Sequence, residues 1–109
     1  MRPLLILLAL LPLVPSPAQA QDDRFKDVVI ERTELGGGLY MLTGAGGNMA
    51  LLTGPEGAVL VDDQFAPLTE RIVASVKEVT DQPVQWVINT HWHGDHTGGN
   101  ENLGKAGAH

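Results

Sequence analysis

The stretch His91-Trp92-His93-Gly94-Asp95-His96 decides how this chain is interpreted. It places three of the four histidines of the protein, together with one aspartate, within six positions. Imidazole and carboxylate are the ligands that zinc and similar divalent metals prefer. Packing does not explain such a cluster, and it is not a repetitive histidine-rich tract that binds metal adventitiously. The stretch therefore predicts a metal site with His91, His93, Asp95 and His96 as ligands.

The backbone around the motif is predicted to be a strand followed by a loop. Residues 84–88 are mostly apolar and predict a strand that runs directly into the motif. At the end of a strand, residues two positions apart point to the same side, so His91 and His93 can bind one ion together. The helical arrangement of two histidines four positions apart is absent, because residue 95 is an aspartate.

Beyond His93, glycine is expected to redirect the chain. Gly94 tolerates backbone angles that other residues avoid, so a turn there returns Asp95 and His96 toward the same pocket. Thr97 is expected to cap a short helix over residues 98–103. The four ligands serve either one ion or two. A single ion held by all four would be a closed structural site, whereas a catalytic site leaves a position open for water.

Upstream of the motif, apolar segments alternate with turns. They predict strands over residues 28–35, 39–42, 48–53 and 58–61. The turn residues 54–57 predict that the last two strands pair as a hairpin. The run Gly44-Ala45-Gly46-Gly47 precedes neither Lys-Ser/Thr nor a helix, so it is interpreted as a flexible hairpin turn and not as a phosphate loop.

The period of the apolar residues changes after Pro67. One face of an amphipathic helix is predicted by Leu68, Ile72, Val73, Val76 and Val79. The helix is expected to end by residues 81–83. Strands, then a helix, then a strand indicate an α/β fold in which helices cover at least one face of a sheet.

Residues 1–20 have the three-part pattern of a secretory signal peptide: a positive start, an apolar run and the small-residue cleavage site Ala18-Gln19-Ala20. A membrane anchor is the alternative, but the apolar run is too short to span a bilayer. We therefore expect export to the periplasm or outside the cell, with no membrane contact after cleavage. Residues 21–27 are expected to form a flexible N-terminus.

Composition narrows the class of partner. The 109-residue chain has no cysteine, so it forms no disulfide. After removal of residues 1–20, six basic residues face thirteen acidic ones, a net charge of −7. This charge argues against nucleic acid or an anionic membrane as a partner and favours a small-molecule substrate. The oligomeric state is left open.

The pattern His91-x-His93-x-Asp95-His96 resembles the signature of the metallo-β-lactamase superfamily. The residues around the motif strengthen the resemblance, namely Asn89-Thr90 before it, Thr97-Gly98-Gly99-Asn100 after it, and the earlier segment Val59-Leu60-Val61-Asp62. The resemblance covers nearly all of residues 28–108. It implies an αβ/βα sandwich, of which this chain would supply the N-terminal half, with metals at the edge between two sheets.

The resemblance also implies roles for individual residues. His91 and His93 would bind the first zinc ion, and Asp95 and His96 the second. Asp95 would also orient a bridging hydroxide and so take part in catalysis. Asp62 resembles the acidic residue that the family places behind its metal loop. An ordinary turn residue at a strand end explains Asp62 equally well.

One departure from the family pattern concerns the other ligands. Family members complete the site with further residues downstream, but this chain stops at His109, in what looks like the start of another strand. We therefore interpret residues 28–109 as a partial domain of a truncated or fragmentary product. Such a chain is expected to bind zinc weakly and to have little activity. His109 has no ligand nearby in sequence and is interpreted as neutral.

Three functions follow from this interpretation. The first is an exported zinc-dependent hydrolase in which metal-bound hydroxide attacks an activated carbonyl, such as that of a lactam, thioester or lactone. The second is an oxidoreductase that holds iron at the same ligands. The third is a metal-binding module without catalytic activity. The sequence does not name the substrate.

Overall fold

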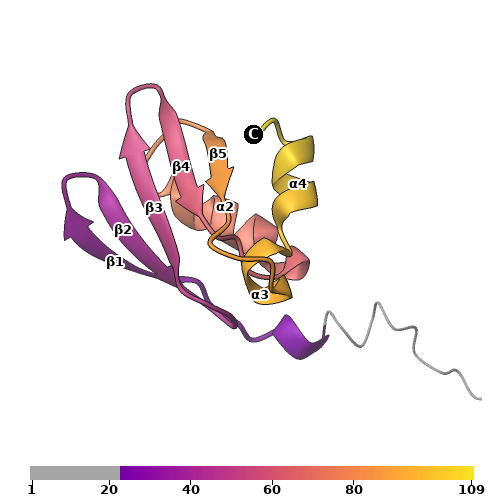
Figure 1. The fold of residues 1–109 in the computed structure, drawn as a ribbon. Helices are drawn as coiled ribbons and strands as arrows, with labels where there is room; N and C mark the ends of the chain where they lie inside the picture. Colours follow the sequence, from indigo (N-terminus) through magenta and orange to yellow (C-terminus); the bar gives the residue numbers. More distant parts are fainter. Residues whose placement is uncertain (1–22) are drawn as a thin grey trace, which may run out of the picture.

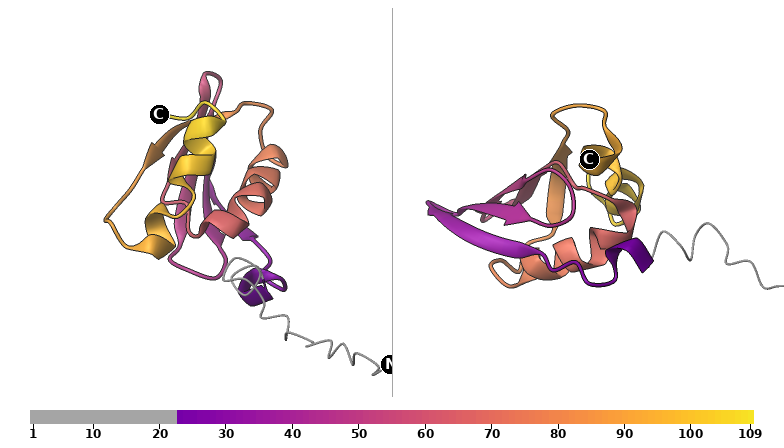
Figure 2. Two further views of the ribbon diagram at one scale, coloured as in Figure 1. Left: turned by 90° about the vertical axis from the view of Figure 1, so that its right-hand side faces the viewer. Right: turned by 90° about the horizontal axis from the view of Figure 1, so that it is seen from below.

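The computed structural model describes residues 23–109 of the chain. Its five-stranded sheet consists of β1 (Glu31–Gly36), β2 (Leu39–Thr43), β3 (Met49–Gly54), β4 (Gly57–Val61) and β5 (Val84–Ile88). The helices are η1 (Ala66–Leu68), α2 (Thr69–Lys77), α3 (Gly94–Thr97) and α4 (Asn100–Lys105). All of them lie on one side of the sheet (Figures 1 and 2). Within residues 23–109, no helix is long and apolar enough to cross a membrane.

The strands lie side by side in their order along the chain. β1 to β4 form an antiparallel meander, and the predicted hairpin is confirmed by the pairing of Gly54 with Gly57. β5 runs parallel to β4 because η1 and α2 carry the chain back across the sheet between them. The predicted strand 84–88 is confirmed with the same bounds, whereas the first strand begins at Glu31 and not at residue 28.

The core lies between the sheet and the helices. Every second strand residue points toward the helices, and cross-strand register places Leu51 opposite Leu60 on this buried face. The helix contributes the predicted apolar face, in which Leu68, Ile72 and Val76 are buried and Val73 and Val79 pack against the core. Leu103 of α4 completes this core.

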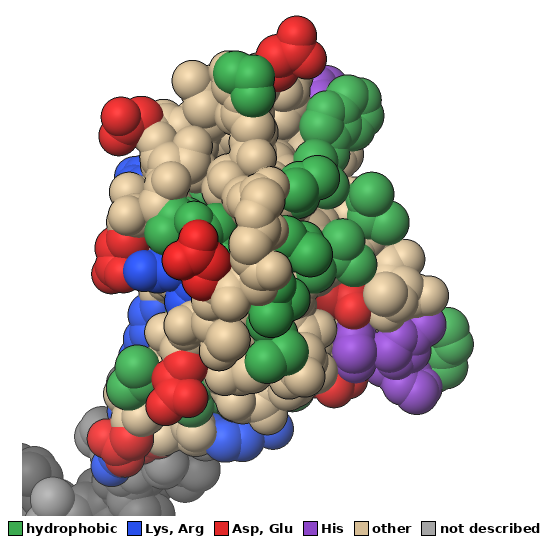
Figure 3. Space-filling view, turned by 90° about the vertical axis from the view of Figure 1, so that its left-hand side faces the viewer, with side chains coloured by type: hydrophobic (Ala, Val, Ile, Leu, Met, Phe, Trp, Pro, Cys, Tyr) green, Lys and Arg blue, Asp and Glu red, His purple; other side chains and the backbone are tan. Residues whose placement is uncertain are grey.

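The opposite face of the sheet is not covered by any described residue. Register places Leu39, Leu52, Val59 and Trp86 in one row across it, and Met41, Ala50, Val61 and Ile88 in a second row. Trp86 and Ile88 are each more than half exposed. Figure 3 shows hydrophobic side chains forming a band over this face, with a cluster of histidines at its lower right.

The N-terminal region differs from its prediction where the structure describes it. Residues 23–25 form a helical turn, and Phe25 is buried with its ring 4.8 Å from that of Phe65. The prediction of a flexible N-terminus missed this contact because one apolar residue among polar neighbours gives no periodic signal. The predicted signal peptide, residues 1–20, lies outside the described residues.

Candidate metal site

The motif lies at the carboxyl ends of the two parallel strands. Asp62 directly follows β4, while Asn89 and Thr90 directly follow β5. The Asp62 N–H donates to the carbonyl of Ile88 at 2.8 Å, which ties the two strand ends together. Ligands commonly bind outside the carboxyl ends of parallel strands, because the loops that follow adjacent strands meet there.

The predicted loop is partly helical, and two of its details are wrong. Thr97 is the last residue of α3 and does not cap α4, which begins at Asn100 after Gly99. Gly94 begins α3 and has no positive φ. The sharp change of direction comes instead from His93, whose extended backbone stands immediately before the helix. The Thr97 hydroxyl donates to the carbonyl of His93 at 3.2 Å and stabilises this turn.

His91 and His93 face each other at the start of the motif. Nε2 of His91 lies 3.1 Å from Nδ1 of His93, and both side chains are exposed. The Thr90 hydroxyl lies 2.8 Å from Oδ2 of Asp62 and 2.9 Å from Nδ1 of His91. Because the hydroxyl donates its only hydrogen to the carboxylate, it must accept one from His91 Nδ1. We therefore assign the tautomer in which His91 Nε2 carries a lone pair toward His93.

Asp95 and His96 form a second pair. Nδ1 of His96 donates to Oδ2 of Asp62 at 2.8 Å, so its Nε2 points away from that carboxylate. This Nε2 lies 3.3 Å from Oδ2 of Asp95. The hydrogen bond to Asp62 and the nearby charge of Asp95 raise the pKa of His96, since both favour a positive ring. The same two carboxylates make this an attractive position for a cation.

The donor atoms fit zinc as two incomplete sets. At zinc–nitrogen distances near 2.0–2.1 Å, tetrahedral ligands lie about 3.3 Å apart, close to the 3.1 and 3.3 Å found within the two pairs. Among residues 23–109, no group of three or more His, Asp or Glu side chains converges in a way that could hold an ion. The site therefore has the right chemistry for zinc, with coordination positions left open in each pair.

Asp62 is the common partner of both pairs. It is 3% exposed and accepts hydrogen bonds from the N–H and hydroxyl of Thr90 as well as from His96. Burial raises the pKa of Asp62, but these hydrogen bonds outweigh it and hold the pKa below the usual value. A buried carboxylate with three donors is more than an ordinary turn residue, and it fixes the orientation of the rings around it.

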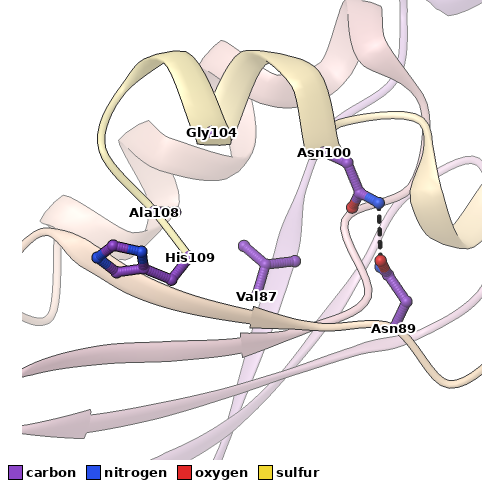
Figure 4. Close-up of a pocket in the computed structure, with 6 residues that line it drawn as sticks. All are labelled: Val87, Asn89, Asn100, Gly104, Ala108 and His109. Atoms are coloured by element: carbon purple, nitrogen blue, oxygen red, sulfur yellow. Dashed lines mark hydrogen bonds between the residues drawn. The ribbon is translucent and has the colours of Figure 1, made fainter.

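Sequence reasoning missed several residues that hold the motif from behind. The carbonyl of His96 accepts from the N–H of Asp63 at 3.0 Å and from Nδ2 of Asn89 at 3.0 Å. Asn100 donates in turn to Asn89 at 2.7 Å (Figure 4). The run Gly44–Gly47, expected only as a turn, packs its backbone against the motif. The contacts of Asp63 and of the glycine run join segments far apart in sequence, so no local pattern signals them. Asn89 and Asn100 flank the motif, but the sequence does not show that their side chains pair.

His109 is not neutral in the fold. Its N–H donates to the carbonyl of Gln85 and its carbonyl accepts from Val87, which is the pattern of a parallel pair with β5. Its ring lies 5.2 Å from that of Trp86. His109 also lines a cavity between β5 and α4 (Figure 4), but none of the motif ligands lines this cavity.

Comparison with known proteins agrees with this geometry. A sequence model of the metallo-beta-lactamase superfamily matches residues 42–109. The chain belongs to the metallo-beta-lactamase superfamily. Its matches in this superfamily include the lactamase-like protein aptB of Emericella nidulans, 41% identical over 66 residues, and the beta-lactamase-like protein 2 homolog of Caenorhabditis elegans, 40% identical over 60 residues. These regions cover 60% and 53% of this chain, but only 21% and 20% of the two relatives.

Solved metallo-beta-lactamase structures have the same fold. The enzyme from Hirschia baltica is 30% identical with a TM-score of 0.66, over 73% of this chain and 41% of that one. FIM-1 from Pseudomonas aeruginosa, in its mono-zinc form, is 26% identical with a TM-score of 0.67, over 76% of this chain and 41% of that one. The expected α/β fold is thereby confirmed, and membership of the metallo-beta-lactamase superfamily supports a metallo-hydrolase-like function.

Proposed function

We propose that residues 23–109 carry part of the zinc centre of an exported hydrolase that acts on a small molecule with an activated carbonyl. The observation that carries the proposal is the arrangement of ligand atoms as two facing pairs, His91 with His93 and Asp95 with His96. The superfamily supports the same chemistry. Because the chain spans about a fifth of its curated relatives, the proposed activity belongs to a protein that supplies the remaining ligands.

Each residue of the site has a proposed task. His91 and His93 hold one ion, while Asp95 and His96 hold a second. Asp62 fixes the tautomer of His96 directly and that of His91 through Thr90, so that each ring presents Nε2 to its ion. Bound zinc supplies Lewis acidity, which polarises a substrate carbonyl and makes water more acidic. Asp95 is the residue proposed to orient the nucleophile.

The substrate class and location extend the proposal. A lactam, a thioester or a lactone has a carbonyl of suitable reactivity. The net charge of −7 without residues 1–20 disfavours nucleic acid as a substrate. Export is proposed from the sequence pattern of residues 1–20 and places the site in the periplasm or outside the cell.

The experiment that tests the proposal follows cobalt(II) binding to each histidine by NMR. Cobalt(II) is paramagnetic and replaces zinc at nitrogen and oxygen ligands. We expect it to broaden the ring signals of His91, His93 and His96 before that of His109, which serves as the internal control. His93→Ala should raise the cobalt(II) concentration needed to broaden the motif, because one of the two ligand pairs is lost, whereas His109→Ala should leave that concentration unchanged. Equal broadening of all four histidines would refute the proposal.

A further inference from the structure

Gln64 is a fully buried polar residue between the glycine run and the motif. Its side-chain Nε2 donates to the carbonyl of Gly47 at 2.6 Å, and its Oε1 accepts from the N–H of Ala45 at 3.2 Å. Its backbone carbonyl accepts from the N–H of Gly98 at 2.7 Å, just after α3. One residue therefore holds the loop Gly44–Gly47 and the chain that leaves the motif.

Two glycines, Gly44 and Gly98, pack so closely against Gln64 that a larger residue would collide with it. A Cβ atom on Gly44 would lie 2.5 Å from Oε1 of Gln64, and one on Gly98 would lie 2.5 Å from its carbonyl oxygen. Real Cβ atoms do not approach other atoms so closely, so no other residue fits at Gly44 or Gly98 without a shift. Gln64 itself has φ of 55°, in the left-handed region that residues other than glycine seldom adopt.

The loop that Gln64 holds lies against the second ligand pair. A Cβ atom on Gly47 would lie 2.3 Å from Cε1 of the His96 ring, and one on Gly46 would lie 2.9 Å from Cβ of Asp95. Neither His91 nor His93 is among the nearest neighbours of these two glycines. The loop is therefore a wall for Asp95 and His96.

We propose that Gln64 is a positioning residue, which clasps the loop Gly44–Gly47 against Asp95 and His96 and so sets the geometry of that ligand pair. This inference rests on the proposed function, because that function makes Asp95 and His96 ligands. Its physical basis is independent of any metal: the amide of Gln64 supplies both a donor and an acceptor to a loop that has no polar side chain of its own.

The test uses two substitutions at Gln64 in the 109-residue chain. Gln64→Met keeps the length of the side chain and removes both hydrogen bonds to the loop. Gln64→Glu keeps the acceptor for Ala45 and loses the donor to Gly47. The matched control is Thr69→Val, which removes two hydrogen bonds from another buried side chain, those to Ala66 and Asn102.

Amide exchange and a zinc(II) titration are the two measurements. The ring ¹⁵N shift of each histidine reports coordination of that nitrogen alone, whereas cobalt(II) would broaden His91 and His96 together because their ring centroids lie 3.9 Å apart. In Gln64→Met, we expect the Ala45 amide to exchange about tenfold faster while the Gly98 amide is unchanged, because only the former bond uses the side chain. The zinc(II) concentration that half-completes the ¹⁵N shift of His96 should rise about tenfold. The concentrations for His91 and His93 should stay within about twofold of the parent. Gln64→Glu should keep the Ala45 amide protected from exchange but weaken metal binding at His96.

The result that would overturn the inference is an equal change at all three histidines in Gln64→Met, or an effect of the same size in Thr69→Val. Should Gln64→Met fail to fold, Gly47→Ala tests the same contact from the loop side. It leaves Gln64 intact and is expected to weaken zinc(II) binding at His96 but not at His91, again followed by the ring ¹⁵N shifts. Unchanged binding at His96 in Gly47→Ala would refute the inference.

Failure of the proposed function gives a different outcome. If cobalt(II) broadens no histidine of the parent chain, the zinc centre is refuted, while the clasp is still tested by the nuclear Overhauser contact between Gly47 and His96. That contact should be present in the parent and lost in Gln64→Met. Its persistence together with an unchanged Ala45 exchange rate would overturn the clasp.

Discussion

Oδ2 of Asp62 lies 2.8 Å from Nδ1 of His96, although 34 positions separate the two residues in sequence. The same oxygen accepts the hydroxyl of Thr90, which in turn accepts from His91. A single buried carboxylate thus determines which nitrogen each of two imidazole rings presents to solvent. In the proposed metal site, Asp62 therefore supports the ligands without being one of them.

Replacement of this carboxylate is expected to weaken metal binding without removing a ligand. Asp62→Asn removes one acceptor, so His96 and Thr90 no longer share it. Loss of such a supporting partner weakens metal binding by about 10- to 100-fold. Competition with a chromophoric chelator measures the change. Asp81→Asn, at an exposed carboxylate of the same charge, should have no effect, and an equal effect of both variants would contradict the role of Asp62.

Zinc binding by the 109-residue chain itself should be weak. Each ligand pair offers two protein donors, whereas a catalytic zinc ion usually has three and a structural one four. Calorimetric titration should therefore give a shallow isotherm with no tightly bound equivalent, and hydrolysis of lactam, thioester or lactone substrates should be near background. Tight binding of two equivalents would contradict this expectation.

Metal content distinguishes the hydrolase from the iron oxidoreductase. Imidazole and carboxylate also suit iron, so the ligands alone do not decide between the two. Elemental analysis of protein expressed without added metal, in a chain that carries the remaining ligands, should find zinc as the dominant metal and no visible absorption. Dominant iron with visible absorption would favour the oxidoreductase.

Asp63 should make folding stability depend on pH. Burial, with a smaller effect from the charge of Asp62, raises the pKa of Asp63 from 3.8 to about 6, although Gly99 donates to it. Within the described residues 23–109, its second oxygen, Oδ2, has no hydrogen-bond partner. The folded chain therefore binds more protons than the unfolded chain between these values, and the free energy of unfolding falls as pH rises from about 4 to about 7.

Asp63→Asn removes this dependence. The difference in unfolding free energy between parent and variant should shift by at most about 3 kcal/mol across that pH range, in favour of the variant at neutral pH. Urea unfolding at several pH values measures it. Parallel pH profiles for the two proteins would show that the pKa of Asp63 is the same in the folded and unfolded chain.

Shortening a leucine side chain should lower the free energy of unfolding by different amounts on the two faces of the sheet. Leu60 is fully buried against the helices, and Leu60→Ala should lower the free energy of unfolding by about 2–5 kcal/mol. Leu52 is 48% exposed on the uncovered face, and Leu52→Ala should cost less than about 1 kcal/mol. Urea unfolding of both variants tests the difference. A similar loss in the two would indicate that the exposed face is buried in solution.

Local pattern is sufficient to predict the strands and the main helix. Alternation and turn glycines set the bounds of β5 and the hairpin, because both are decided by neighbouring residues. The run from Met49 to Leu52 is apolar on both faces, which is typical of a strand covered on both sides, yet among the described residues only one side is covered.

Contacts between distant segments could not be predicted in this way. The clasp by Gln64 joins residues 17 to 34 positions away, and a single glutamine after a strand gives no signal of it. The glycine run has the composition of a turn, so its second use, close approach to Asp95 and His96, is visible only once those residues are placed beside it. For Gly94 the prediction fails in the opposite direction. The sequence predicts backbone angles that only glycine adopts, but Gly94 has no positive φ.

Asp62, Asp63 and Gln64 are consecutive, and each side chain hydrogen-bonds to a different segment. Asp62 bonds to His96, Asp63 to Gly99 and Gln64 to Gly47. Positive φ at the first and third residues makes these divergent directions possible. Inserting or deleting one residue here would send every side chain to the wrong loop at once, and no single later substitution would restore all three. Loop grafting and evolutionary length variation should therefore be tolerated at the β1–β2 turn long before they are tolerated in this tripeptide.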